Sequence, residues 1–469
     1  MLGLIKDSLL LWGVWGRCAS TEGDLVVSTA FGQRVLVRRG NESERPARWI
    51  LQVLEAKDGR LGPDRPAGSI VGLLGALRKV LGVQARGQGL RIAASGGPAS
   101  PARAAAAQTT SSRPRNADSS VSSSLASPLP TSVSVVTGFL GSGKTTFIQK
   151  VLRDLHFSRT AVIVNEFGEI GLDHDVLASS SDALIKLSTG CLCCAIRSDL
   201  VETLLDLHRR RADGEVDFDR IIIETSGLAD PVPILQSLMM DKAVATLFVL
   251  DRVLTLVDAV HGLETLRKHV EAQRQIAVAG SILLTKTDLV TPSTALLDEL
   301  SALNPNAPHV FGGHGALKFD ELFERDVSRD ARHAMEVLVA RDSAPRHSGG
   351  IETISFTSAA SIPALALTLF LQALVDQAGD RLLRVKGLVQ VAEMPDQPAL
   401  VHGVQHVFAV PEWLDAWPGE QHHTRLVFIG SSIPRCWPER LLKAIAEDVL
   451  DARRSGLVEA PRSAITASR

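Results

Sequence analysis

The sequence predicts an α/β protein in which a parallel β-sheet carries helices on both faces, followed by a small α+β domain. Three observations lead to this prediction. Short apolar runs alternate with helical segments between residues 133 and 285. These runs are apolar almost without interruption, which is typical of strands buried on both faces. After a polar stretch around residues 340–350, a second series of strand-like and helix-like segments runs to residue 452.

The expected elements of the first series fall at regular intervals. The strands are expected at 133–137, 161–164, 221–223, 246–250, 254–257 and 281–285, and the helices at 145–155, 199–211 and 263–278. In the second series, strands are expected at 351–357, 382–392, 401–410 and 425–429, with helices at 362–378 and 438–452. The first series supplies the layers of the parallel sheet, and the second supplies the α+β domain.

Composition limits the classes of function. The chain has 469 residues, of which 45% are hydrophobic and 22% charged, so it is globular for most of its length. A net charge of −2 provides no bulk attraction to nucleic acid or to anionic membranes. No apolar run reaches the roughly 18 residues that a membrane span requires. We therefore expect a cytoplasmic protein with neither nucleic acid nor membrane as a partner.

The chain divides into three parts. Residues 1–94 are studded with Gly and Arg, and their short apolar bursts suggest no core. In residues 91–132, 29 of 42 residues are Ala, Ser, Pro or Thr, a composition typical of a linker. We therefore expect residues 1–131 to be a poorly ordered extension, either accessory or an over-long start. The nucleotide-binding domain is expected at 132–340 and the C-terminal domain at 351–455.

A phosphate-binding loop follows the first expected strand. Residues Gly138–Thr145 match G-x-x-x-x-G-K-[ST] and open a helix. Backbone N–H groups of such a loop surround a phosphate, and Gly138, Gly141 and Gly143 permit the backbone conformations and the close approach. Lys144 would reach the β- and γ-phosphate oxygens, and the Thr145 hydroxyl would ligate Mg²⁺. Ser142 and Thr146 belong to the same expected nucleotide contacts. The alternative is a plain glycine-rich turn.

A carboxylate at the end of a neighbouring strand would complete the metal site. Glu224 ends an apolar run and is followed by Thr-Ser-Gly227. Glu224 would hold Mg²⁺ directly or through water, and the Gly227 N–H would sense the γ-phosphate. The alternative is an ordinary strand-end carboxylate at a turn.

The residues after the strand 281–285 resemble the guanine-specificity element of GTPases. They read Thr285-Lys286-Thr287-Asp288. Asp288 would accept hydrogen bonds from guanine N1–H and N2–H₂, two donors that adenine lacks, while the Lys286 stem covers the face of the base. Thr285 stands where Asn is usual. A surface Lys/Asp pair is the alternative.

Three cysteines lie within four positions, at Cys191, Cys193 and Cys194. Thiolates select Zn²⁺ or Cu(I) over hard cations, and three of them leave a fourth coordination position open. The acidic segment 165–173 resembles a nucleotide-responsive loop. In it, Glu166 or Asp173 would position Mg²⁺ or the attacking water, and Glu169 is a candidate fourth ligand of the thiolate site. Redox chemistry and inert buried thiols are the alternatives.

Together these motifs resemble those of the CobW-type G3E GTPases, P-loop metal chaperones related to HypB and UreG. The resemblance covers about residues 132–455. It rests on the segments Gly138–Thr145, Asn165–Gly168, Gly190–Cys194 with Arg197 and Asp199, Glu224–Gly227, Thr285–Asp288, Arg384–Gly387, Val404–Gln405 and Thr424–Gly430. The chain lacks a His-rich tract, so we expect no auxiliary metal store.

The resemblance implies GTP hydrolysis coupled to metal delivery, with GTP, Mg²⁺ and Zn²⁺ as cofactors. Lys144, Thr145, Glu166 and Glu224 would be the catalytic residues, and zinc would pass from the three cysteines to a client metalloprotein. A homodimer is a further hypothesis. The alternatives are a P-loop small-molecule kinase with a structural thiolate site, a cobalt-delivery GTPase, and a redox-responsive module. Preference for ATP would favour the kinase, and reversible thiol oxidation without stoichiometric metal would favour the redox module.

Overall fold

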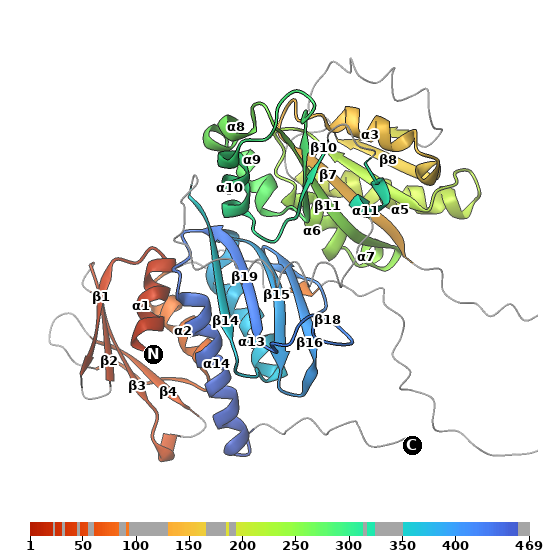
Figure 1. The fold of residues 1–469 in the computed structure, drawn as a ribbon. Coiled ribbons are helices and arrows are strands. Elements are labelled where there is room, and N and C mark those ends of the chain that lie inside the picture. Colours follow the sequence, from red (N-terminus) through yellow and green to blue (C-terminus); the bar gives the residue numbers. More distant parts are fainter. Residues whose placement is uncertain are drawn as a thin grey trace, which may run out of the picture.

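The structure is a computed structural model of the chain. It describes residues 1–21, 24–30, 33–44, 47–54, 61–83, 91–92, 130–165, 184–186, 194–312, 317–323 and 350–457. The described strands form three sheets. In Figure 1 the nucleotide-binding domain lies above the C-terminal sheet, and the N-terminal domain packs on the far side of helix α14 (Trp437–Arg454). No helix in the described part of the chain is both long and apolar enough to cross a membrane.

The nucleotide-binding domain contains the expected parallel sheet. Its described strands are β7 (Thr131–Gly138), β8 (Thr160–Asn165), β9 (Leu184–Lys186), β10 (Arg220–Thr225), β11 (Phe248–Asp258), β12 (Ser281–Thr285) and β13 (His309–Phe311). They lie in the order β13-β12-β11-β7-β10-β8-β9, and every pairing is parallel. The carboxyl ends of the central strands therefore meet at one edge of the sheet.

Helices cover both faces of this sheet, as the sequence predicts. The described helices are α3 (Lys144–Leu152), η2 (Leu155–Phe157), α5 (Cys194–Ala212), α6 (Val232–Met240), α7 (Lys242–Leu247), α8 (Gly262–Lys268), α9 (Val270–Ala277), α10 (Thr294–Leu303) and α11 (Phe319–Phe323). Helices α5 and α6 pack on the face that carries Val133 and Val135. Helix α3 packs on the opposite face, against Val136. This alternation explains why the strands are apolar without interruption.

Two expectations about elements in this domain are wrong. The expected strands 246–250 and 254–257 are one strand, β11, whose register shifts between Leu250 and Arg252. The residues before it form α7 because Asp241 accepts hydrogen bonds from the amides at the start of that helix. The expected helix 263–278 is divided into α8 and α9, because His269 has an extended backbone.

The C-terminal domain is an antiparallel sheet backed by two helices, close to the expected arrangement. Its elements are β14 (Ile351–Ser358), α13 (Ala364–Ala378), η3 (Gly379–Arg381), β15 (Leu382–Val391), β16 (Met394–Val404), β17 (Val407–Phe408), β18 (Glu412–Trp413), β19 (Thr424–Ser431) and α14. The expected strand 401–410 is the end of β16 followed by β17. One face of the sheet packs on α13 and α14, and the other packs on α9 and α10.

The expectation that residues 1–94 lack a core is wrong for the described residues. They form α1 (Leu2–Leu11), β1 (Gly16–Thr21), β2 (Asp24–Thr29), β3 (Arg34–Arg39), η1 (Glu42–Glu44), β4 (Trp49–Leu54), β5 (Arg65–Ala67) and α2 (Ile70–Val80). The five strands make an antiparallel meander in chain order. In β2 and β3 buried residues alternate with more exposed ones, so half of each strand is polar or charged. Because the alternation extends over only six residues in each of these strands, the sequence gives little indication that they contribute to a core.

The N-terminal and C-terminal domains share one hydrophobic core. Leu4 and Ile5 of α1 and Leu73 of α2 belong to the same buried cluster as Phe370 of α13 and Trp437 of α14. In Figure 1, α14 lies between the N-terminal helices and the C-terminal sheet. A further short strand, β6 (Arg91–Ile92), pairs with β17 at the edge of the C-terminal sheet. The expected linker falls mostly on residues 93–129, which lie outside the described residues.

Polar contacts reinforce this shared core. The Trp437 indole N–H donates to the Ser8 hydroxyl over 3.1 Å, and the Ile70 amide donates to Asp448 Oδ2 over 2.5 Å. Arg440 donates to Asp7 Oδ2 over 2.7 Å. The described residues among the first 83 therefore form a domain that is docked on the C-terminal domain.

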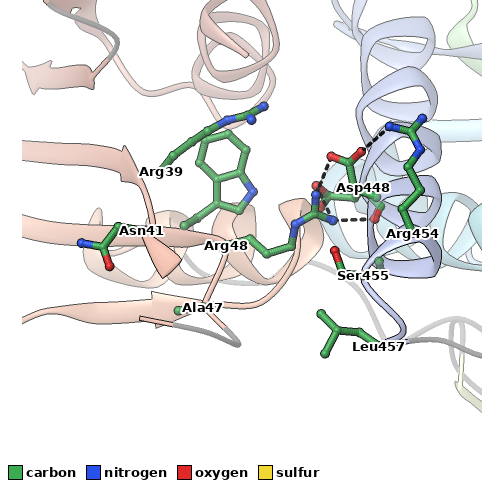
Figure 2. Close-up of a pocket in the computed structure, with 12 residues that line it drawn as sticks. Arg39, Asn41, Ala47, Arg48, Asp448, Arg454, Ser455 and Leu457 are labelled. Carbon is green, nitrogen blue, oxygen red and sulfur yellow. Dashed lines mark hydrogen bonds and ion pairs between the residues drawn. The ribbon is translucent and has the colours of Figure 1, made fainter. Parts of the chain in front are cut away.

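A cavity of about 390 Å³ lies in the seam between the N-terminal domain and α14. Figure 2 shows Arg48 reaching from the N-terminal domain toward Asp448 on α14. Arg48 donates to the backbone oxygen of Asp448 over 2.5 Å and to Asp451 Oδ2 over 2.7 Å. Burial raises the pKa of the Asp448 carboxyl, although the Ile70 amide and Arg48 oppose the shift. These charged groups serve to dock the two domains.

Candidate nucleotide site

Four loops converge at the carboxyl edge of the parallel sheet. They follow β7, β10, β11 and β12, which are adjacent strands with a common direction. This is the edge at which ligands bind in open α/β sheets. The loops carry the phosphate motif, Glu224–Gly227, Asp258 and Thr285–Asp288.

The phosphate loop has the conformation that its glycines permit. Gly141 and Gly143 adopt left-handed φ values of 72° and 88°, and a side chain added to either would meet open space. Gly138 has a φ of 145°, and an added Cβ would lie 2.4 Å from Leu256 O and 2.7 Å from Ser142 Oγ. Gly143 precedes α3, so the loop ends at the positive end of a helix with room for an anion.

Lys144 and Thr145 begin α3 and occupy their expected places. Lys144 Nζ donates to Gly138 O over 2.8 Å and to Phe139 O over 3.2 Å, so the amine lies across the loop. Thr145 Oγ1 donates to Glu224 Oε1 over 2.9 Å. The structure therefore brings together the hydroxyl and the carboxylate of the expected metal site, and both are the oxygen ligands that Mg²⁺ prefers.

The remaining residues of the phosphate loop surround this pair. Ser142 is buried, whereas Thr146 is exposed at the first turn of α3. Gly227 lies against the loop: an added Cβ would lie 2.8 Å from Leu140 N and 2.9 Å from Leu140 Cα. Only glycine fits at this contact between the two loops.

The expected base-reading element contacts the phosphate loop directly. Thr285 Oγ1 donates to Ser142 O over 2.8 Å, so the residue in place of the usual Asn ties the two motifs together. Lys286 has a left-handed φ of 55°, and its Nζ donates to Asp258 Oδ2 over 2.6 Å. Asp288 is exposed in the turn that follows. A cavity of about 180 Å³ lies beside the loop, lined by residues of β11, α8 and α9 and by Lys286.

Asp258 is a site residue that the sequence reasoning missed. Its burial opposes ionisation, but hydrogen bonds from Lys286 and from the amides of Val260 and His261 outweigh that cost and hold the pKa below its usual range. The carboxylate is therefore ionised at neutral pH and fixes Lys286. The sequence pattern that identified Glu224, a carboxylate at the end of an apolar run, also applies to Asp258, which directly follows the apolar run Leu254–Val257.

The thiolate site falls outside the described residues. Cys191, Cys193, Glu166, Glu169 and Asp173 belong to this part of the chain, as does the side chain of Cys194, the first residue of α5. In sequence, Glu166, Glu169 and Asp173 follow β8, which ends at Asn165, and the cysteines follow β9. Strands β8, β9 and β10 are parallel, so all three end at the carboxyl edge of the sheet. Among the described residues, no group of three His, Cys, Asp or Glu side chains could hold a metal ion.

This fold and phosphate loop define a P-loop nucleotide-binding protein of the α/β class. Residues 132–311 match the family described as CobW/HypB/UreG, nucleotide-binding domain, and residues 351–446 match the cobalamin synthesis protein cobW C-terminal domain. The chain belongs to the CobW/HypB/UreG family, as the motifs predict. The N-terminal domain lies outside both matched regions.

Characterised relatives match over nearly their whole length. The chain is 32% identical to the zinc chaperone YjiA of Escherichia coli over 305 residues, which cover 65% of this chain and 95% of the relative. It is 32% identical to the zinc chaperone CobW of a Sinorhizobium species over 342 residues, which cover 63% and 91%. The crystal structure of the Zn(II)-bound YjiA GTPase from E. coli aligns with a TM-score of 0.52 at 29% identity, and the alignment covers 68% of this chain and 98% of that one.

Proposed function

We propose that the protein is a GTP-hydrolysing metallochaperone that binds Zn²⁺ through Cys191, Cys193 and Cys194 and transfers it to a client metalloprotein. The observation that carries this proposal is the Thr145–Glu224 pair beside the phosphate loop, at the sheet edge where β9, the strand before the cysteines, also ends. Relatives that are named zinc chaperones support it.

Each residue of the nucleotide site has its own role in the proposed hydrolysis. Lys144 exchanges its loop carbonyl contacts for the β- and γ-phosphate oxygens, where it stabilises the charge that builds up during phosphoryl transfer. Thr145 and Glu224 hold Mg²⁺, which when bound neutralises phosphate charge. The Gly227 N–H senses the γ-phosphate, and Glu166 orients the attacking water. Asp288 accepts the two guanine donors, with Lys286 held beside the base by Asp258.

Zinc is the cargo in this proposal. Three thiolates favour Zn²⁺ over hard cations, and the fourth position stays open for Glu169 or for a ligand of the client. A carrier must hold its metal in one state and release it in another, which requires a switch that distinguishes the two states. The segment 165–173 would be that switch, because it follows β8, which pairs with β10, and precedes the thiols in the chain.

A zinc titration tests the coupling. Linkage is reciprocal. If a bound nucleotide changes the affinity of the protein for zinc by some factor, bound zinc must change the affinity for that nucleotide by the same factor. We expect different zinc dissociation constants for the GDP-bound protein and for the protein bound to a non-hydrolysable GTP analogue, and GTP turnover that depends on Zn²⁺. The Cys191→Ser, Cys193→Ser, Cys194→Ser triple variant should bind no stoichiometric zinc and yet retain GDP binding. Equal constants in the two nucleotide states would contradict a zinc-delivery switch.

A homodimer is part of the same proposal, since two copies could share a client. Light scattering with GDP and with the GTP analogue tests it. A mass of one chain in both states would refute the dimer without affecting the proposed hydrolysis.

A further inference from the structure

Helix α9 lies directly behind the loop that follows β10. Gln275, on this helix, is 1% exposed, and its Nε2 donates to Gly227 O and to Ala229 O, each over 3.1 Å. The same loop touches the phosphate loop on its other side through Gly227 and Leu140. The loop is therefore clamped between the phosphate loop and one buried amide.

A second contact from α9 strengthens this clamp. Arg274 donates to Asp230 Oδ2 over 3.1 Å, and Asp230 Oδ1 accepts from the Val232 amide at the start of α6. Two consecutive residues of α9 thus hold the two ends of the segment between Gly227 and α6.

Helix α9 is itself anchored, so it provides a rigid support. The backbone oxygen of Gln275 accepts from the fully buried Thr255 hydroxyl over 3.1 Å. At the C-terminal end of α9, Arg384 of β15 donates to Val278 O. A site residue is precise only when the element that carries it is fixed, and α9 is fixed to both β11 and the C-terminal sheet.

We propose that Gln275 is a positioning residue for GTP hydrolysis: it holds the Gly227 loop against the phosphate loop so that the Gly227 N–H meets the γ-phosphate. This proposal rests on the proposed function, since it assigns a role in the same reaction. The hydrogen bonds of Gln275 go to the backbone of the Gly227 loop, so we place its action on the loop and not on the reacting atoms.

The test compares two buried glutamines of the same helix. Gln273 is 3% exposed and donates to Leu266 O over 2.7 Å, away from the Gly227 loop. We expect Gln275→Leu to lower kcat for GTP about tenfold or more with KM changed less than about threefold, because the phosphate loop still binds the nucleotide. Gln273→Leu should lose stability to a similar degree and keep kcat within about twofold of the wild type.

A glutamate variant supplies a signature that a merely structural role would not produce. A carboxylate cannot donate to Gly227 O, whereas the protonated acid can. The kcat of Gln275→Glu, relative to the wild type, should therefore rise as the pH falls from about 8 to 6, since burial raises the pKa of a carboxyl. Equal kcat for Gln275→Leu and Gln273→Leu, or a flat ratio for Gln275→Glu, would overturn the proposal.

Hydrogen exchange separates this proposal from the proposed function. In the nucleotide-free protein, Gln275→Leu should exchange faster at residues 226–231 than Gln273→Leu, whether or not the protein hydrolyses GTP. If the wild type neither binds nor hydrolyses GTP, the proposed function fails. If the two variants exchange alike in the loop, the positioning role of Gln275 fails.

Discussion

The fold of the nucleotide-binding domain is easier to predict from its sequence than the fold of the N-terminal domain. Strands such as β10 and β12 are buried at nearly every position because helices cover both faces of the sheet. The N-terminal strands β2 and β3 bury only alternate residues, and their core is completed by residues from α13 and α14. A domain whose core is completed by residues far away in sequence shows only weak local sequence patterns.

Removing the Lys144 amine should produce the largest effect. It sharpens the comparison of the two domains, because Lys144 belongs to a local sequence motif and not to a hydrophobic core. We expect Lys144→Ala to lower GTP turnover by about 10²–10³-fold, since it removes a charge that stabilises the transition state. The melting temperature should stay within about 2 °C of the wild type. Phosphate release and thermal unfolding measure the two effects.

The control for this variant is Lys150→Ala, which removes an exposed amine from the same helix. It should leave turnover unchanged. Wild-type turnover in Lys144→Ala would break the assignment of the phosphate site.

Trp437→Ala tests whether the N-terminal domain depends on the C-terminal domain. Trp437 is fully buried in the shared core and hydrogen-bonds to Ser8. We expect the free energy of unfolding of the joint N- and C-terminal unit to fall by about 3–5 kcal/mol. Hydrogen exchange should report the loss in α1 as well as in α13, and GDP binding should persist.

Trp413→Ala is the matched control, because Trp413 is 43% exposed. It should cost well under about 1 kcal/mol, the usual range for surface positions. If Trp437→Ala loosened α13 but left α1 protected, the two domains would not share one cooperative core.

Asp288→Ala tests the base-reading element, which is the least enclosed part of the predicted site. The loss of two hydrogen bonds to a charged group should weaken GTP binding by about 2–3 kcal/mol, or about 30- to 150-fold, and leave ATP binding unchanged. Calorimetry with both nucleotides measures this. A wild-type protein that binds ATP as tightly as GTP would contradict guanine selection.

The smallest expected effect is a pH dependence in the N-terminal domain. The hydrogen bond from Arg38 and the amide of Asn41 lower the pKa of Glu44 from 4.5 to about 2. Because the folded-state pKa is depressed, this contribution to stability is present above pH 4.5 and is lost as the pH falls toward 2. The protection of the β3 amides, corrected for the intrinsic pH dependence of hydrogen exchange, should therefore fall between about pH 5 and 3 more in the wild type than in Glu44→Gln. An equal loss of protection would remove Glu44 as the cause.

The parts of the molecule that could be predicted are those specified by neighbours in sequence. The phosphate loop, Glu224 at a strand end and the strand 281–285 each follow from a local pattern, and the structure has them in place. The break at His269 and the register shift in β11 depend on tertiary packing, so periodicity did not show them.

The same distinction holds within the candidate site. Thr285 looked like a departure from the usual Asn, yet its hydroxyl makes a contact to the phosphate loop that only the structure reveals. Gln275 carries no sequence signal, because a single glutamine on a helix is ordinarily a surface residue. Its role depends on the approach of α9 to the loop after β10, which no spacing encodes.

The order of synthesis determines when the shared core can form. Ile70 leaves the ribosome 378 residues before its partner Asp448. At about 5–20 residues per second, that interval is roughly 20 to 75 seconds. During this time the apolar faces of α1 and α2 have no α14 to cover them, while the whole nucleotide-binding domain is being translated. The nascent N-terminal segment therefore exposes apolar surface until α14 is made, and slower translation of residues 131–350 would lengthen that exposure.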